Sequence, residues 1–477
     1  MADSKRWLFL LFTSIAIFGA EWVVDETGIL ASRLSGTSPD CFQKNGTDST
    51  CLSMTDSQFN ALYVVHFWAG SVISFLSGFL VTRYGVWNCS LATASALFSG
   101  MILFTVGPYC SSTTAAFAVM MVGRLLYGCG YWGNCVVSQQ VKSHWFFGRE
   151  LAVAFAVYNC SFRLGSIIAY PSVGAVVEKF GMQTTMWIVF AIGLVGPVTA
   201  TIAGWIHLRY AEISMDSFVL EEVRHHTVKS TLGIVRHLTK HYWAVAAFLF
   251  FYYGGIMSVM SDFPKFLMEA RNMAETQAGL ISGIISDMAL LSPLLGVFTD
   301  RYGWRDVQMV ICSTLFLLGL LGLVSISGFN AILYCFIVGL SSAIMGACIW
   351  SGVVVVTTPG TVGVAMGLSS AFQTFGAGLF LLIGGFILDA GTDTKSKWLN
   401  FFVMGTCAVG VSLIAALAAW YLDSKTPHRP LRSRSSVKPS LVSAEDTMAR
   451  RDSERDPFIS NISSYSCEPE PTLPLIL

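Results

Sequence analysis

One short segment occurs twice in the chain, at equivalent places in its two halves. The first copy reads Gly78-Phe79-Leu80-Val81-Thr82-Arg83-Tyr84-Gly85, and the second reads Gly296-Val297-Phe298-Thr299-Asp300-Arg301-Tyr302-Gly303. Each copy closes the second long apolar run of its half. The repeat therefore predicts a chain built from two duplicated halves.

The apolar runs around the two copies are long enough to cross a bilayer. A helix rises 1.5 Å per residue, so about 20 residues cover a hydrocarbon core of about 30 Å. The fold class is predicted to be an all-α membrane protein with six helices in each half. The expected spans, numbered 1 to 12 in chain order, are 7–33, 57–82, 86–107, 115–139, 150–175, 184–208, 242–265, 276–299, 307–327, 330–357, 362–389 and 398–422.

The composition excludes several functional classes. Hydrophobic residues make up 54% of the 477 residues and charged residues 12%, which is not the balance of a water-soluble enzyme. Lys+Arg and Asp+Glu both number 29, so no net charge attracts nucleic acid. The loops hold no serine-hydrolase, zinc-protease or phosphate-loop motif. We therefore expect no enzyme activity, no nucleic-acid partner, no metal and no cofactor. The expected partner of the chain's apolar surface is the lipid bilayer.

The positions of the basic residues predict the orientation of the chain. Most of the 29 lysines and arginines fall on cytosolic segments if both termini are cytosolic. The expected organisation is a short cytosolic N-terminus, two six-helix halves, a cytosolic linker between them and a disordered tail rich in Ser, Pro and charge. The N-terminus is 1–6, the two halves are 7–208 and 242–422, the linker is 209–241 and the tail is 423–477.

The repeated Gly-x-x-x-Asp-Arg-x-Gly pattern resembles the signature of the major facilitator superfamily. In that superfamily the glycine lets two helices approach closely, and the charged pair latches the halves together. The resemblance implies a close-packing role for Gly78 and Gly296 and a latch formed by Arg83 and the pair Asp300-Arg301. The first copy carries Thr82 where the aspartate is expected.

A longer resemblance runs through spans 4 and 5. Its segments are Gly123-Arg124, Tyr127-Gly128-Cys129-Gly130, Trp145 to Leu151 and Arg163-Leu164-Gly165-Ser166. In this order they resemble the lysosomal dipeptide transporter family, major facilitator superfamily domain-containing protein 1. The resemblance implies dipeptide transport by alternating access. It also implies a lysosomal or endosomal membrane, with the plasma membrane as the alternative location. An accessory glycosylated single-pass protein is a further expected partner.

Three further positions enter through this resemblance. Asp25 falls on an aspartate near the end of the family's first span, and Lys265 falls on a lysine that closes its seventh. Trp132 occupies a place where the family carries a glutamate. We expect Asp25 to serve structure or gating, and Lys265 and Trp132 to line the substrate site.

Charged residues inside the spans identify a candidate binding site. A charge near the bilayer centre costs about 3 kcal/mol on insertion scales, so each one needs a partner or a function. Glu21 and Asp25 are four residues apart, share one face of span 1 and should face a central cavity. The planar guanidinium of Arg163 can bind the carboxylate of a solute or an acidic side chain on another helix. Arg124 either contacts the solute or ties spans 1 and 4 together.

An acid and an arginine facing one cavity suit a zwitterionic solute. Glu21 would bind the ammonium group of the solute, and Arg163 would bind its carboxylate. Glu21 would thereby take the role of the family's span-4 glutamate, whose place Trp132 occupies here. A dipeptide fits such a pair, and a single amino acid fits if the two anchors lie closer together. His66 and Asp287 are candidates for proton coupling, with hydrogen-bonded polar positions between helices as the alternative.

The longest exoplasmic loop carries signs of a lumenal environment. Cys41 and Cys51 flank the sequon Asn45-Gly46-Thr47. We expect a disulfide between these cysteines and a glycan on Asn45.

Three functions compete at this point. The first is a carrier of small zwitterions, and the others are an organic-anion carrier and a transport-inactive nutrient receptor or scaffold in a membrane complex. The charges inside the first half favour a carrier, because a scaffold has no reason to tolerate their insertion cost.

Overall fold

The structure is a computed structural model that describes most of the chain. The described residues are 2–34, 51–146, 150–214, 235–236, 238–273, 275–325, 330–358, 361–390 and 393–433. Within these ranges all regular structure is helical. The helices are α1 (Ala2–Ile29), α2 (Ala31–Leu34), α3 (Asp56–Val106), η2 (Gly107–Tyr109), α4 (Thr113–Phe146), α5 (Leu151–Gly193), α6 (Val195–Ser214), α9 (Lys240–Arg271), α10 (Glu275–Asp287), η3 (Met288–Leu291), α11 (Ser292–Tyr302), α12 (Arg305–Ser325), α13 (Ala331–Val355), α14 (Val362–Ala390) and α15 (Thr394–Lys425).

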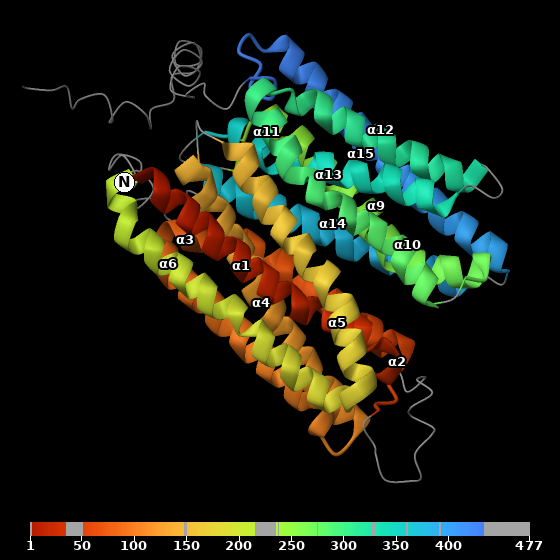
Figure 1. Cartoon of the computed structure of the whole chain (residues 1–477). Coiled ribbons are helices and arrows are strands. Elements are labelled where there is room, and N and C mark those ends of the chain that lie inside the picture. Colours follow the sequence, from red (N-terminus) through yellow and green to blue (C-terminus); the bar gives the residue numbers. More distant parts are fainter. Residues whose placement is uncertain are drawn as a thin grey trace, which may run out of the picture. The chain divides into compact units, whose positions relative to one another are not determined.

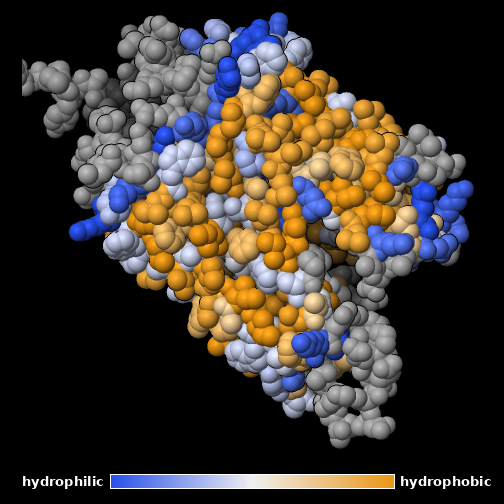
Figure 2. Space-filling model, in the orientation of Figure 1, coloured by the Kyte–Doolittle hydropathy of each residue, from blue (hydrophilic) through white to orange (hydrophobic). Residues whose placement is uncertain are grey.

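The prediction of twelve membrane-spanning helices is confirmed. The described residues contain 12 stretches that are long and apolar enough to cross a bilayer. Hydrophobic side chains dominate the middle of the face in Figure 2, and hydrophilic ones gather toward its ends. The spans are Lys5–Ile29, Ala61–Val81, Arg83–Tyr109, Thr113–Trp145, Leu151–Val177, Lys179–Tyr210, Lys240–Leu267, Leu280–Tyr302, Arg305–Ser325, Ala331–Val355, Val362–Leu388 and Thr394–Lys425.

One predicted boundary was wrong by nearly two turns. Span 4 was expected to end at residue 139, but its helix continues to Trp145. The run of polar residues Ser138-Gln139-Gln140, followed by Lys142 and Ser143, suggests a loop by composition. All five are nevertheless buried in α4. The extension places Lys142 inside a span instead of in a cytosolic loop.

Two long helices each contain a sharp turn between consecutive spans. Gly85 in α3 has φ 80° and Gly181 in α5 has φ 79°, and Gly303 between α11 and α12 has φ 76°. Glycine adopts positive φ without steric penalty, so it allows the chain to reverse there. Gly85 and Gly303 are the final residues of the two octapeptide copies. The last glycine of the repeated motif is thus required by the turn that follows spans 2 and 8.

The helices of the two sequence halves form two packed groups (Figure 1). In the first, α3 packs against α4, and α1 packs against both α5 and α6. In the second, α9 packs against α14 and α15, and α12 packs against α13 and α15. The groups meet mainly through α3 with α14 and through α5 with α11. All of these helices belong to one compact unit, Met1–Val437.

Candidate solute site

Glu21 lies in the interior of the first half and is held by groups from two other spans. Its side chain is buried. The Tyr131 hydroxyl on α4 donates a hydrogen bond to Glu21 Oε2 at 2.7 Å, and Ser166 Oγ on α5 lies 3.5 Å from Oε1. A Cβ added at Gly165 would stand 2.8 Å from the Glu21 Cβ. Glycine at position 165 therefore permits the approach of α5 to α1 at this acid.

Arg163 lies near the middle of the 27-residue span Leu151–Val177. It is close enough to Glu21 and Asp25 on α1, and to Tyr253 on α9 of the second half, to interact electrostatically with each. Its guanidinium lies 4.8 Å from the centre of the Phe162 ring. Within the described part of the chain it makes no hydrogen bond or ion pair. The donor fork of Arg163 is thus placed between the halves without a fixed protein acceptor.

Arg124 has a different environment and ties spans 1 and 4 together. It is buried, and its Nη2 donates to the Val24 carbonyl at 3.4 Å. Its guanidinium lies 4.2 Å from the centre of the Phe104 ring, within the range of a cation–π interaction. Glu26, a buried acid not singled out in the sequence, also interacts with this charge. These contacts favour the structural interpretation of Arg124 over solute binding.

Glycines on span 4 allow α3 to approach it closely. A Cβ added at Gly123 would stand 2.8 Å from the Phe104 nitrogen on α3, and one at Gly128 would stand 2.7 Å from the His66 carbonyl. Backbone atoms cannot move aside as a side chain can, so only glycine fits at both positions. The glycine-rich pattern of span 4 is therefore a requirement for its close packing against α3.

Trp132 and His66 lie in one aromatic cluster. Their ring centres are 6.1 Å apart, and the ring of Phe67 lies 6.0 Å from that of Trp132. The Trp132 ring also covers Gly70, where an added Cβ would collide with it. His66 is buried, and its Nδ1 has no hydrogen-bond partner among the described residues. Trp132 therefore closes over span 2, and the proton-coupling role of His66 stays a prediction.

Two residues predicted from the second half lie apart from this cluster. Lys265 is exposed, and its Nζ is 4.0 Å from the Glu269 carboxylate, which also forms a 2.5 Å ion pair with Lys397. Asp287 is exposed at the end of α10, where span 8 breaks into the short helix η3 before α11. Among the described residues, neither forms a hydrogen bond or ion pair with Glu21 or Arg163. Their roles in solute binding and proton coupling remain predictions.

The second copy of the repeated motif joins the two halves. Asp300 accepts hydrogen bonds from the backbone nitrogens of Ala152 and Val153, both at 2.9 Å. These are free N–H groups in the first turn of α5, whose own N-cap residue provides no side-chain acceptor. A Cβ added at Gly296 would stand 2.9 Å from the Ala152 carbonyl. Arg301 is exposed, and among the described residues it makes no hydrogen bond or ion pair with the first half.

The first copy brings the backbones of the two halves close together. A Cβ added at Gly78 would stand 2.6 Å from the Gly363 carbonyl on α14, and one at Gly367 would stand 2.6 Å from the Ser74 carbonyl. Arg83 is exposed beside the Tyr84 ring. The seam of spans 2 and 11 therefore has close helix packing. Among the described residues no carboxylate pairs with Arg83, so a latch at Arg83 stays a prediction.

The halves are closed at the end of the bundle where α1 begins, α6 ends and α9 begins, which we call the linker end. One apolar cluster there contains Trp145, Phe146 and Phe155 of the first half together with Trp350 and Val353 of the second. This cluster joins the two halves by apolar packing at the linker end.

Lys142 is buried beside this apolar cluster and was not identified from the sequence. Its side chain is 0% exposed, and its Nζ has no hydrogen-bond partner among the described residues. The ammonium lies 3.0 Å from the centre of the Tyr158 ring and 5.3 Å from that of Phe155. A cation–π contact offsets only part of the free-energy cost of burying a charge. Lys142 thus makes the closed linker end less stable than its apolar packing suggests.

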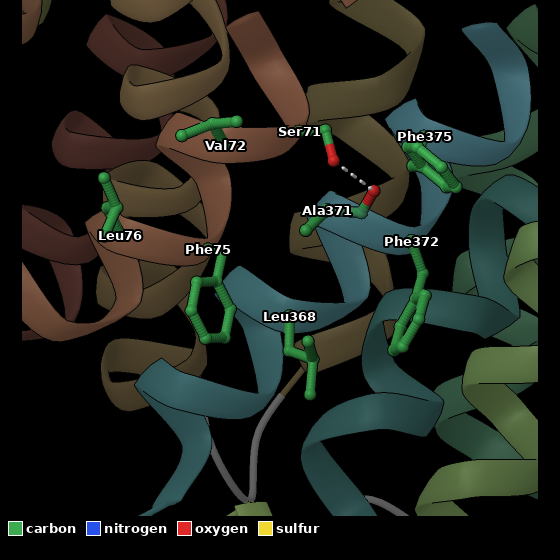
Figure 3. Close-up of a pocket in the computed structure, with 8 residues that line it drawn as sticks. All are labelled: Ser71, Val72, Phe75, Leu76, Leu368, Ala371, Phe372 and Phe375. Carbon is green, nitrogen blue, oxygen red and sulfur yellow. Dashed lines mark hydrogen bonds between the residues drawn. The ribbon is translucent and has the colours of Figure 1, made fainter. Parts of the chain in front are cut away.

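A groove of about 330 Å³ lies on the seam of spans 2 and 11 (Figure 3). Its single lining hydroxyl, Ser71, already donates to the Ala371 carbonyl at 3.2 Å. Val72 is 64% exposed, which places this side of the groove toward lipid. The groove therefore does not suit a zwitterion. It is lined by Ser71, Val72, Phe75, Leu76, Leu368, Ala371, Phe372 and Phe375.

The predicted features of the long loop lie partly outside the described residues. Asn45 and Cys41 are not described, whereas Cys51 is. The disulfide and the glycan remain predictions.

Curated relatives match most of the chain. It is 24% identical over 397 residues to a Danio rerio protein named lysosomal dipeptide transporter MFSD1, covering 80% of this chain and 81% of that protein. The Homo sapiens protein of the same name is 22% identical over 429 residues, covering 88% and 87%. A 115-residue segment is 30% identical to the MFS-type efflux pump MMF1 of Pseudozyma antarctica, covering 24% of this chain and 21% of the pump.

Solved structures and a family model agree on the fold. The proton:xylose symporter XylE matches with a TM-score of 0.68 at 12% identity, covering 91% of this chain and 99% of that one. A bacterial homologue of the iron transporter ferroportin in an outward-facing state matches with a TM-score of 0.64 at 12% identity, covering 88% and 99%. The model of the Major Facilitator Superfamily matches residues 6–286 and 245–467. The chain belongs to the Major Facilitator Superfamily and is a transporter by family and fold, not an enzyme.

Proposed function

We propose that this protein carries small zwitterionic solutes across a membrane by alternating access, and that dipeptides are its substrates. The observation that carries the proposal is the placement of Arg163. A mid-span guanidinium without a fixed acceptor in the described part of the chain suits an incoming carboxylate, which it binds through two parallel N–H···O bonds.

The second anchor in this proposal is Glu21. It lies on the neighbouring span within electrostatic reach of Arg163, so the site offers both signs of charge to one solute. Similarity to relatives named lysosomal dipeptide transporter supports the peptide class. A single amino acid remains the alternative, because Glu21 and Arg163 are neighbours in one half.

Uptake of a labelled dipeptide into proteoliposomes tests this proposal. We expect Arg163→Ala to abolish uptake and Arg163→Lys to restore part of it, because a lysine keeps the charge but loses the bidentate fork. Arg209→Ala, at an exposed position, is the matched control and should transport normally. Full transport by Arg163→Ala at equal expression would contradict the proposal.

A panel of ligands separates the competing functions. Ligands that bind the folded state raise its Tm, so dipeptides, amino acids and dicarboxylates can be compared directly on purified protein. Stabilisation by dicarboxylates alone would favour an organic-anion carrier. Dipeptide binding without flux would favour the nutrient receptor or scaffold.

The membrane and its orientation belong to the same proposal. The names of the relatives favour a lysosomal membrane, with cytosolic termini and a lumenal loop around Asn45. An accessory single-pass glycoprotein is expected from the family resemblance. Loss of a glycosidase-sensitive mobility shift in Asn45→Gln tests the orientation, since only a lumenal or exoplasmic loop receives a glycan.

A further inference from the structure

The segment after span 12 folds back onto the linker end of the second half. Residues Thr426–Ser433, called the clamp segment below, follow the end of α15 at Lys425. Leu431 of this segment is 0% exposed and belongs to the main apolar cluster. Its backbone nitrogen donates to Asp423 Oδ1 at 2.9 Å, and its carbonyl accepts from the Arg305 nitrogen at 3.1 Å. The clamp segment is therefore a packed part of the membrane domain.

Arg305 connects the clamp segment to the latch between the halves. Its side chain is 0% exposed. Nε donates to Ser351 Oγ at 3.0 Å, Nη1 donates to the Ser433 carbonyl at 2.8 Å, and Nη2 lies 3.9 Å from Asp300 Oδ1. Asp300 in turn accepts both N–H groups at the start of α5. A continuous polar path thus runs from the Ser433 carbonyl to the first turn of span 5.

Gly303 makes room for this arrangement. It stands at positive φ, and a Cβ added there would collide with the Arg432 carbonyl and stand 2.6 Å from the Ser433 carbonyl. A side chain at position 303 would therefore displace the carbonyl that holds Arg305. The clamp segment and the final glycine of the second motif copy fit each other.

We propose that the clamp segment is a positioning element of the latch, which acts through Arg305 to hold Asp300 against the N-terminus of α5. Without the Ser433 carbonyl and Leu431, Arg305 would lose a hydrogen-bond acceptor and become exposed to water. Its electrostatic hold on Asp300 would weaken, because an ion pair contributes less in water than in a buried site. The closed linker end would then open more often, whatever solute the protein carries.

Two truncations form a matched pair for the test. A chain that ends after Val437 keeps the clamp segment and leaves the Ser433 carbonyl in a peptide bond, and a chain that ends after Lys425 removes the segment. The reporter is Ala156→Cys in a Cys160→Ser background, because Ala156 is 0% exposed and lies under Gly296 in the closed seam. Its labelling by a water-soluble maleimide is measured in nanodiscs by mass spectrometry. No solute is needed, so this test and the uptake test of the proposed function fail independently.

We expect the chain ending after Val437 to label at the rate of the full chain, and the chain ending after Lys425 to label at least about fivefold faster. Arg305→Gln should accelerate labelling to a similar extent, and combining it with the shorter truncation should add little further. Val409→Ala, which removes buried apolar volume elsewhere in the second half, should leave the rate unchanged.

A second variant protects the test against misfolding. If the chain ending after Lys425 does not fold, Gly303→Ala in the full chain displaces the same carbonyls and should also accelerate labelling. Equal labelling rates for the full chain and a folded Lys425 truncation would overturn the proposal. So would an unchanged rate in folded Gly303→Ala, or equal acceleration by Val409→Ala.

Discussion

The hydroxyl of Tyr131 on span 4 donates a 2.7 Å hydrogen bond to the carboxylate of Glu21 on span 1. The acceptor is a buried acid within electrostatic reach of Arg163. Tyr131 fixes one carboxylate oxygen, and the other oxygen has only the 3.5 Å contact with Ser166. Glu21 is thus oriented by the protein while retaining capacity to accept a hydrogen bond from a ligand.

Glu21→Gln should selectively weaken the binding of dipeptides with a free amino terminus. Hydrogen bonds to charged groups contribute about 1.5–3 kcal/mol, which corresponds to roughly 10- to 150-fold in Kd. N-acetylated dipeptides, if they bind, should be much less affected, because they lack the ammonium group. Thermal-shift titration of both ligand classes measures the difference. Equal losses for both would mean that Glu21 does not recognise the amino end.

Lys142→Met should stabilise the conformation described here. Burying an amine without a hydrogen-bond partner costs free energy, and an apolar side chain of similar volume avoids that cost. The Tm of the purified protein without solute should therefore rise. Lys240→Met changes an exposed lysine at the same end of the bundle and serves as the control. A lower Tm for Lys142→Met would show that the ammonium has a stabilising partner.

Gly367→Val should open the seam between spans 2 and 11. The added Cβ would stand 2.6 Å from the Ser74 carbonyl and 3.1 Å from the Gly78 nitrogen. These are backbone atoms, so they can move away only if the whole helix moves. Transport should be lost while expression is retained. Gly410→Val is the matched control, since nothing lies within 4 Å of a Cβ added there. Normal transport by Gly367→Val would mean that the seam tolerates separation.

Glu269→Gln should lower the Tm at neutral pH, and the difference should persist into mildly acidic solution. Burial raises the pKa of Glu269, but its hydrogen bond from Lys397 and the positive charges of Lys265 and Lys397 outweigh this effect and lower the pKa below 4.5. A lowered folded-state pKa contributes stability above the unfolded pKa, and that stability is lost as the pH falls through the folded value. Tm measured against pH checks this. A difference that vanishes already near pH 6 would contradict it.

The sequence predicted the fold well because its signals are local. Twelve apolar runs and one duplicated octapeptide are sufficient for the helix count and the halving, since lipid leaves a spanning helix few alternatives. The end of span 4 was missed because Gln139, Gln140 and Lys142 look like a loop by composition. Their burial depends on helices from both halves, which periodicity in a single segment cannot report.

The candidate site was predictable to a smaller extent. Glu21, Asp25 and Arg163 stand out by their insertion cost, and the structure brings them together. Tyr131 and Glu26 were not identified, because a tyrosine in an apolar helix or a second acid beside Asp25 has no distinctive pattern. Lys265 entered only through family resemblance and lies beside Glu269, apart from the other charges.

The close approach of spans 2 and 11 determines which movements remain available to the two halves. Their backbones approach closely at Gly78 with Gly363 and at Gly367 with Ser74, and further along the Trp68 side chain covers Gly378. Helices in such contact can roll or bend over one another, but they cannot slide without separating. This seam therefore serves as a fulcrum, and the displacement of a residue grows with its distance from that axis.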